Sequence, residues 1–326
     1  MNATMTAEEW VAAIDRHYLA EFIPNGGSSI KFIACSTEVD HREAAGRLRS
    51  CAEQRHLIVA DIDSSVVRIH MIEQIFGRIC DQMPWRNLVE SVLRQFAISN
   101  HWLVPNEFAD SGIVQQLEDL NRLGLQQISL ELQRRISTDI LVNRKLARDF
   151  RLAMHWMART RLDAGAENDA VMQALTDWLG GRTRLVSDLR RFQIFTKVNR
   201  SNARDLLGSL LVWIREAGFA GLVVNVDGYR LLSAERGNDG VINYSSAAIL
   251  DAYQVFREFI DTTDELDGLL FNVFVPIEFI NTDSKSRGLG KYSALFDRVY
   301  DGVRDRLLPN PLTALARIGH RMEVES

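Results

Sequence analysis

Residues 221–227, Gly-Leu-Val-Val-Asn-Val-Asp, form a run of branched apolar residues that ends on an acid. Apolar side chains on both sides of the pleat are typical of a strand that is buried on both faces, as in a parallel sheet. Similar runs occur at residues 28–36, 56–65 and 269–280, and amphipathic helical patterns lie between them. Because strands that alternate with helices indicate βαβ units, the expected fold class is α/β with a parallel sheet.

The strand pattern is interrupted by a long stretch, from Trp85 to about Gly181, that shows helical patterns only. The predicted organisation is therefore an α/β core in two halves, residues 1–85 and 186–326, with an inserted all-helical block at residues 86–185. A last long helix is expected at residues 291–308.

Composition narrows the class of protein. Hydrophobic residues make up 46% of the chain and charged residues 25%, as in ordinary globular proteins. No apolar run approaches the roughly 20 residues of a membrane span, and the N-terminal residues lack a signal-peptide pattern. The three cysteines (Cys35, Cys51 and Cys80) show no CxxC spacing, so we expect a reduced, cytoplasmic protein with no membrane partner. The net charge of −5 requires any contact with DNA to be local.

A nucleotide site at the carboxyl edge of such a sheet needs a glycine-rich loop with a lysine, an acid that holds Mg²⁺, and an arginine. The chain contains no GxxxxGK[ST] string. The nearest glycine string, residues 25–31, ends on Lys31 but precedes the first strand. Residues 36–42, expected as the loop between the first strand and its helix, contain two acids and no glycine. This segment predicts an ordinary turn, with a phosphate-binding loop as the alternative.

Asp227 closes a buried strand, where P-loop NTPases hold Mg²⁺, and is the candidate metal ligand. Buried strands that end on Asp also occur in many α/β proteins, so Asp227 alone does not establish a magnesium site. Gly228 follows, so no adjacent side chain could act as a general base. Asp61 and Asp63, at the end of another strand, are interpreted as solvated loop carboxylates or helix N-caps.

Two arginines, Arg287 and Arg298, flank a stretch that follows the last apolar strand. An arginine in this arrangement can reach the nucleotide of a neighbouring subunit. The alternative is that Arg298, beside Asp297, pairs within its own helix.

The helical block carries an excess of basic residues, with eight Lys or Arg and two acids between Arg134 and Arg161. Such a stretch fits contact with DNA phosphates, and it equally fits a solvated face or an acidic partner subunit. Arg144, Arg148 and Arg151 have the spacing of one helix face. The nearby aromatic residues are expected to pack in a core; they are Phe150, Trp156 and Phe192. The candidate DNA-binding residues are Arg144, Lys145, Arg148, Arg151 and Arg159.

Several strings, taken in order, resemble one family. They are residues 202–227, 252–266 and 287–299, followed by Asn-Pro-Leu at 310–312. They are similar to the BREX BrxC/BrxD-type ATP-binding proteins of bacterial anti-phage systems and their relatives in phosphorothioation-linked defence. The resemblance covers mainly residues 195–320. It implies a P-loop NTPase-like, AAA+-like core.

The resemblance also implies roles for individual residues. Asp227 matches the magnesium-holding Asp, and Arg298 lies where AAA+-like relatives carry a finger or sensor arginine. Gly228 stands where an active member has Glu, and residues 35–43 lack glycine and lysine. The resemblance therefore implies a degenerate ATPase-like subunit that binds ATP and Mg²⁺ weakly or not at all.

The expected role is that of a regulatory or scaffolding component in a prokaryotic phage-defence or DNA-modification complex. Its partners would be other subunits, copies of itself in a homo-oligomer, and DNA along the helical block. One alternative is a slow, DNA-associated ATPase in which Lys31 or a partner supplies the missing phosphate ligand. The other is a protein-interaction module that binds no nucleotide.

Overall fold

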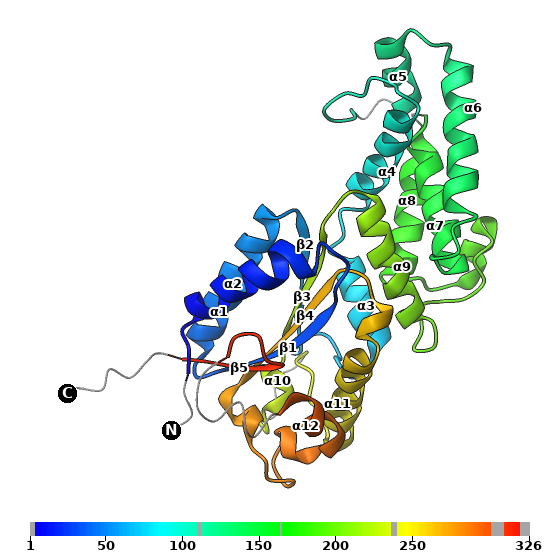
Figure 1. The fold of residues 1–326 in the computed structure, drawn as a ribbon. Coiled ribbons are helices and arrows are strands. Elements are labelled where there is room, and N and C mark those ends of the chain that lie inside the picture. Colours follow the sequence, from blue (N-terminus) through cyan, green and yellow to red (C-terminus); the bar gives the residue numbers. More distant parts are fainter. Residues whose placement is uncertain (1–3, 110–111, 164, 236–239, 301–309, 320–326) are drawn as a thin grey trace. The chain divides into compact units, whose positions relative to one another are not determined.

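The computed structural model describes residues 4–109, 112–163, 165–235, 240–300 and 310–319 (Figure 1). The chain divides into two compact units. One combines Met1–Ile79 with Ala220–Ser326 and contains the sheet, and the other is Cys80–Phe219.

A parallel sheet forms the centre of the first unit and has five strands within the described residues. The strands follow the order β2-β3-β4-β1-β5, and every neighbouring pair is parallel. The predicted α/β class with a parallel sheet is thus confirmed, while its P-loop identity stays a prediction. The bounds are β1 (Ser29–Cys35), β2 (Leu57–Asp63), β3 (Gly221–Asp227), β4 (Leu269–Pro276) and β5 (Leu315–Ile318).

Helices cover both faces of this sheet (Figure 1). On one face, α1 and α2 bury Trp10 and Leu48 in a common core with Val223 of β3. On the other face, the Phe256 ring of α11 lies 5.7 Å from that of Phe32 in β1. The helices of this unit are α1 (Ala7–Ile14), continued by a π-helical segment (Asp15–Phe22), α2 (Glu38–Gln54), α3 (Ile72–Cys80), α10 (Tyr229–Leu232), α11 (Ser246–Asp261) and α12 (Ser293–Val299). Short 3-10 segments are Thr263–Glu265, Ile277–Ile280 and Leu289–Lys291. Because helices pack on both faces of the sheet, β3 and β4 are apolar along most of their length and do not alternate between apolar and polar residues.

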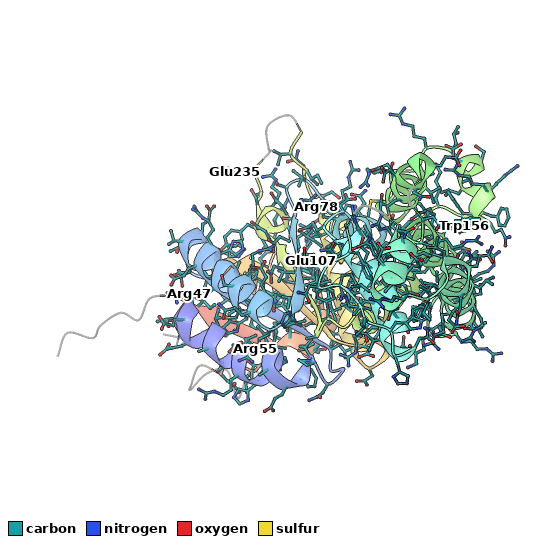
Figure 2. The ribbon with its side chains drawn as sticks, turned by 90° about the horizontal axis from the view of Figure 1, so that it is seen from above. Arg47, Arg55, Arg78, Glu107, Trp156 and Glu235 are labelled. Carbon is teal, nitrogen blue, oxygen red and sulfur yellow. The ribbon has the colours of Figure 1, made fainter. Side chains whose placement is uncertain are left out.

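Ion pairs fasten α2 to the N-terminal helical stretch. Arg47 lies 3.8 Å from Glu8 of α1, and Arg55 Nε lies 2.5 Å from Asp15 Oδ1 in the π-helical segment. Figure 2 shows Arg47 and Arg55 where these two helical stretches run side by side.

The second unit contains helices joined by loops, and no strand occurs among its described residues. It extends from Cys80 to Phe219, beyond the predicted block of residues 86–185. Trp85 and Phe150 pack in its core with ring centroids 6.5 Å apart. Its elements are α4 (Trp85–Ser99), α5 (Ile113–Asn121), α6 (Leu125–Arg135), a π-helical turn (Ile136–Ile140), α7 (Arg148–Thr160), α8 (Ala166–Leu179), a 3-10 segment (Val186–Phe192) and α9 (Ala203–Glu216).

The structure differs from the prediction at the start of α2 and at β5, and it describes only part of the predicted last helix. The loop predicted at residues 36–42 is wrong, because α2 already begins at Glu38. Strand β5 was not predicted, since four residues are too few to show a periodic pattern. The last helix ends at Val299, and residues 301–309 of the predicted helix lie outside the described residues.

Within the part of the chain that the structure describes, none of the helices has the length and apolarity needed to span a membrane.

Candidate functional site at the carboxyl edge of the sheet

Three carboxylates meet where β2 and β3 end. The strand register pairs Asp63 with Asp227, and Asp61 with Asn225, on neighbouring strands. These side chains line a cavity of about 320 Å³, at the small end of the usual range for ligand sites. The rest of its wall comes from Ile62 of β2, from α2 and from Arg78 of α3, which Figure 2 labels. The residues from α2 are His41, Arg42, Ala45, Gly46 and Arg49.

Asp227 is held beside a histidine of α2. Its Oδ1 accepts a hydrogen bond of 3.0 Å from the backbone N–H of Tyr229, and its Oδ2 lies 3.9 Å from His41 Nδ1. The imidazole of His41 stacks on the Tyr229 ring at 5.1 Å and contacts the Phe274 ring at 4.9 Å. Burial raises the pKa of Asp227 and lowers the pKa of His41, so each side chain is biased toward its neutral form. No local sequence pattern points to His41, because its partners Tyr229 and Phe274 come from distant segments.

A polar row runs from the cavity wall across three strands. Asn225 donates from Nδ2 to Asp61 Oδ1 at 3.1 Å, and Asn272 of β4 donates to Asn225 Oδ1 at 3.1 Å. Arg49 of α2 forms an ion pair with Asp61. Asp61 and Asp63 are exposed, as expected, but they are residues of β2 and not of a loop.

The connection from β1 to α2 has no room for a phosphate cradle. β1 ends at Cys35 and α2 begins at Glu38, so Ser36 and Thr37 are the whole turn. Thr37 and Asp40 form a capping box, in which Asp40 N–H donates to Thr37 Oγ1 at 3.1 Å and Thr37 N–H donates to Asp40 Oδ2 at 3.0 Å. These are amides of the kind that bind phosphates at a helix N-terminus. They are satisfied by the chain's own groups, and Glu38 and Asp40 add negative charge to the first turn.

Gly228, the residue after Asp227, lies against β4. Its N–H donates to the Phe274 carbonyl at 2.8 Å. A Cβ atom at this position would lie 3.1 Å from that carbonyl oxygen and 3.2 Å from Val275 Cγ1. A side chain at position 228 therefore requires β4 to give way by a few tenths of an ångström.

Lys31 does not lie beside Asp227. It is a buried residue of β1, and its Nζ donates to Tyr18 Oη at 2.6 Å, to the Thr313 carbonyl at 3.2 Å and to the Leu312 carbonyl. The glycine string before it lies at the amino end of the sheet, where Gly268 N–H donates to Gly26 O at 3.2 Å.

The two arginines that follow β4 are engaged elsewhere in the unit. Arg298 Nε and Nη2 lie 2.5 Å and 3.0 Å from the two carboxylate oxygens of Asp261 in α11, and Nη1 donates to the carbonyl of Ala294 at 2.7 Å. Arg287 donates to the carbonyls of Ser233 at 2.7 Å and Tyr244 at 3.2 Å. None of these contacts involves Asp227.

A bound magnesium ion, which the resemblance implies, has little support from the side chains present. Among the residues that the structure describes, no group of three or more His, Cys, Asp or Glu side chains is arranged to hold a metal ion. One carboxylate oxygen of Asp227 already accepts a hydrogen bond from the Tyr229 amide. The described side chains therefore do not by themselves form a tight Mg²⁺ site.

The predicted DNA-binding residues lie in the helical unit, but not on one helix face. Arg144 and Lys145 precede α7, which begins at Arg148, so the expectation of a shared face is wrong for Arg144. Arg151 Nη1 donates to the carbonyl of Leu141 at 3.0 Å and is only half-exposed.

Most of the other candidates are exposed. Arg148 pairs with Asp149 at 2.8 Å, and the guanidinium of Arg159 lies 5.7 Å from the centre of the Trp156 ring. Phe150 and Phe192 are buried, as predicted. Trp156 is half-buried, which the sequence did not indicate.

Comparison with known proteins adds the family. The model of the family described as "BREX system ATP-binding protein BrxC/D" matches residues 18–317, nearly the whole chain. No curated protein and no solved structure matches the chain. The matched range includes Asp227 and the polar row across β2, β3 and β4. The resemblance seen in the sequence is thus confirmed: the chain belongs to the BREX system ATP-binding protein BrxC/D family and is a component of a BREX phage-defence system.

Proposed function

We propose that this chain is a regulatory or scaffolding subunit of its defence complex, with a P-loop-derived, AAA+-like core that has lost ATP hydrolysis. The observation that carries the proposal is the two-residue turn between β1 and α2, closed by the Thr37–Asp40 capping box. Phosphoryl transfer depends on positioned cations and amides around the phosphates. In this chain the amides of Ser36 and Thr37 are satisfied internally, and the acids of the first helical turn, Glu38 and Asp40, disfavour a triphosphate there.

The other parts of the edge support the same proposal. Gly228 leaves no acid next to Asp227 in the sequence, and a side chain at position 228 would be tight against β4. Lys31 and Arg298 are both bonded to groups of their own unit. ATP and Mg²⁺ would accordingly be bound weakly or not at all, and the protein would act in the cytoplasm through assembly with other subunits.

The test is turnover and binding of ATP by the full chain. We expect no release of phosphate above background, and no increase in melting temperature with about 1 mM ATP and Mg²⁺, since a ligand that binds only the native state raises its stability. Turnover that disappears in Asp227→Ala, and persists in the matched control Asp264→Ala, would overturn the proposal and favour the slow ATPase. A melting-temperature increase without turnover would support a regulatory nucleotide.

A second proposal is contact between the helical unit and DNA phosphates. It is supported by exposed cations in an acidic protein: Arg144, Lys145, Arg148 and Arg159. Affinity for a DNA duplex should fall as salt rises, and charge reversal at Arg144, Lys145 and Arg148 should weaken it further. Affinity that is independent of salt would contradict phosphate contact.

A further inference from the structure

An exposed aromatic side chain stands on a firmly anchored segment of the helical unit. Phe195 is 56% exposed, although its neighbour Ile194 is fully buried. On the other side, the Thr196 carbonyl accepts a 2.9 Å hydrogen bond from Trp178 Nε1, and Thr196 Oγ1 donates to Asp149 Oδ2 at 2.8 Å. The ring of Phe195 is therefore presented to solvent by a backbone that is fixed before and after it.

One cation lies against this ring, and further cations flank it in the sequence. The guanidinium carbon of Arg148 lies 5.9 Å from the centre of the Phe195 ring, within the range of a cation–π contact. Lys197 Nζ donates a 2.6 Å hydrogen bond to the Arg184 carbonyl. This bond ties the two ends of residues 184–197 together. Between residues 182 and 200 the only acid is Asp188. The exposed cations of this stretch are Arg182, Arg184, Arg190, Arg191, Lys197 and Arg200.

We infer that Phe195 and the cations around it form a binding surface for single-stranded nucleic acid, in which a base stacks on Phe195. The inference deepens the proposed DNA contact and rests on it. Surfaces that bind single strands combine basic side chains along the backbone with aromatic rings that stack on bases. Both elements occur together at this segment.

The exposed ring distinguishes this partner from the alternatives. A duplex keeps its bases stacked inside, so a surface that contacts only duplex phosphates gains nothing from an exposed phenylalanine. An acidic protein would pair with the arginines and lysines, but it carries no planar groups that repeat at the spacing of the charges. A single strand supplies phosphates and unpaired bases together.

The experiment measures fluorescence anisotropy with the full chain, a labelled oligothymidine of about 15 nucleotides and a duplex of the same length. We expect tighter binding to the single strand. Phe195→Ala should weaken that binding about 5- to 100-fold and leave duplex binding unchanged, whereas Phe195→Trp should retain it. Leu130→Ala, at a side chain that is 68% exposed on α6, is the matched control and should change neither affinity.

The outcomes distinguish failure of this inference from failure of the proposed contact with DNA phosphates. If Phe195→Ala binds oligothymidine as well as the wild type does, while both nucleic acids bind in a salt-dependent way, the inference is overturned and the DNA contact stands. Failure of both to bind at low salt overturns both. Displacement of oligothymidine by polyglutamate at equal charge concentration would assign the surface to an acidic protein and also overturn the inference.

Discussion

At the scale of the residue, Lys31 is held by contacts within its own unit. Its ammonium group is buried in β1 and bonded to neutral oxygens: the Tyr18 hydroxyl and the carbonyls of Leu312 and Thr313. These contacts tie the segment before β5 to the sheet. Burial lowers the pKa of Lys31 to about 8, because desolvation disfavours the charged form.

This position predicts a particular pH dependence of stability. The folded-state pKa lies below the usual value of 10.5, so the unfolded chain binds more protons between these two values. The free energy of unfolding should therefore rise from about pH 8 to about pH 10, by at most about 3 kcal/mol. Urea denaturation should show this slope in the wild type and in Lys285→Met, and its persistence in Lys31→Met would contradict the assignment.

Asp227 predicts an effect of the opposite kind. Burial raises its pKa, so the folded protein binds more protons than the unfolded chain just above the usual value of 3.8. The ionised carboxylate then costs stability at neutral pH. Asp227→Asn, which keeps the acceptor for the Tyr229 amide, should stabilise the fold by less than about 1 kcal/mol, since over a third of the side chain is exposed. Melting temperatures should show the gain at about pH 7 and its loss below about pH 4. A lower melting temperature at neutral pH would refute it.

At the scale of the element, the capping box at the start of α2 fixes where the chain leaves the sheet. Thr37→Ala should destabilise the protein by about 1 kcal/mol, because it leaves a helix amide without its acceptor. Thr37→Ser keeps the hydroxyl and should match the wild type in urea denaturation. Equal stability of the alanine variant would mean that the cap does not hold this helix.

The same helix shows what the sequence could and could not predict. Strands β1 to β4 were found because their apolar runs face helices on both sides. The observed start of α2 is earlier than predicted, because a run of polar residues is also typical of a loop, although Thr37 and Asp40 have the three-residue spacing of a capping box. Asp227 was placed correctly at the end of a strand. The position of His41 depends on Tyr229 and Phe274, and no local pattern specifies contacts between such distant segments.

At the scale of the whole molecule, two compact units with their own buried side chains occur in one chain. Independent cores usually break two-state behaviour, because each can unfold at its own temperature. Calorimetry should therefore give an unfolding enthalpy larger than the van't Hoff value, with two overlapping transitions. A single transition with equal enthalpies would show that the units unfold as one.

The brevity of the turn between β1 and α2 has an evolutionary consequence. Replacing one amino acid by another cannot lengthen a backbone, so under the proposed function a longer phosphate loop would require an insertion of several codons at this turn. An acid at position 228 would in addition require β4 to give way by a few tenths of an ångström. Under the same proposal, any energy taken from ATP would come through a neighbouring subunit.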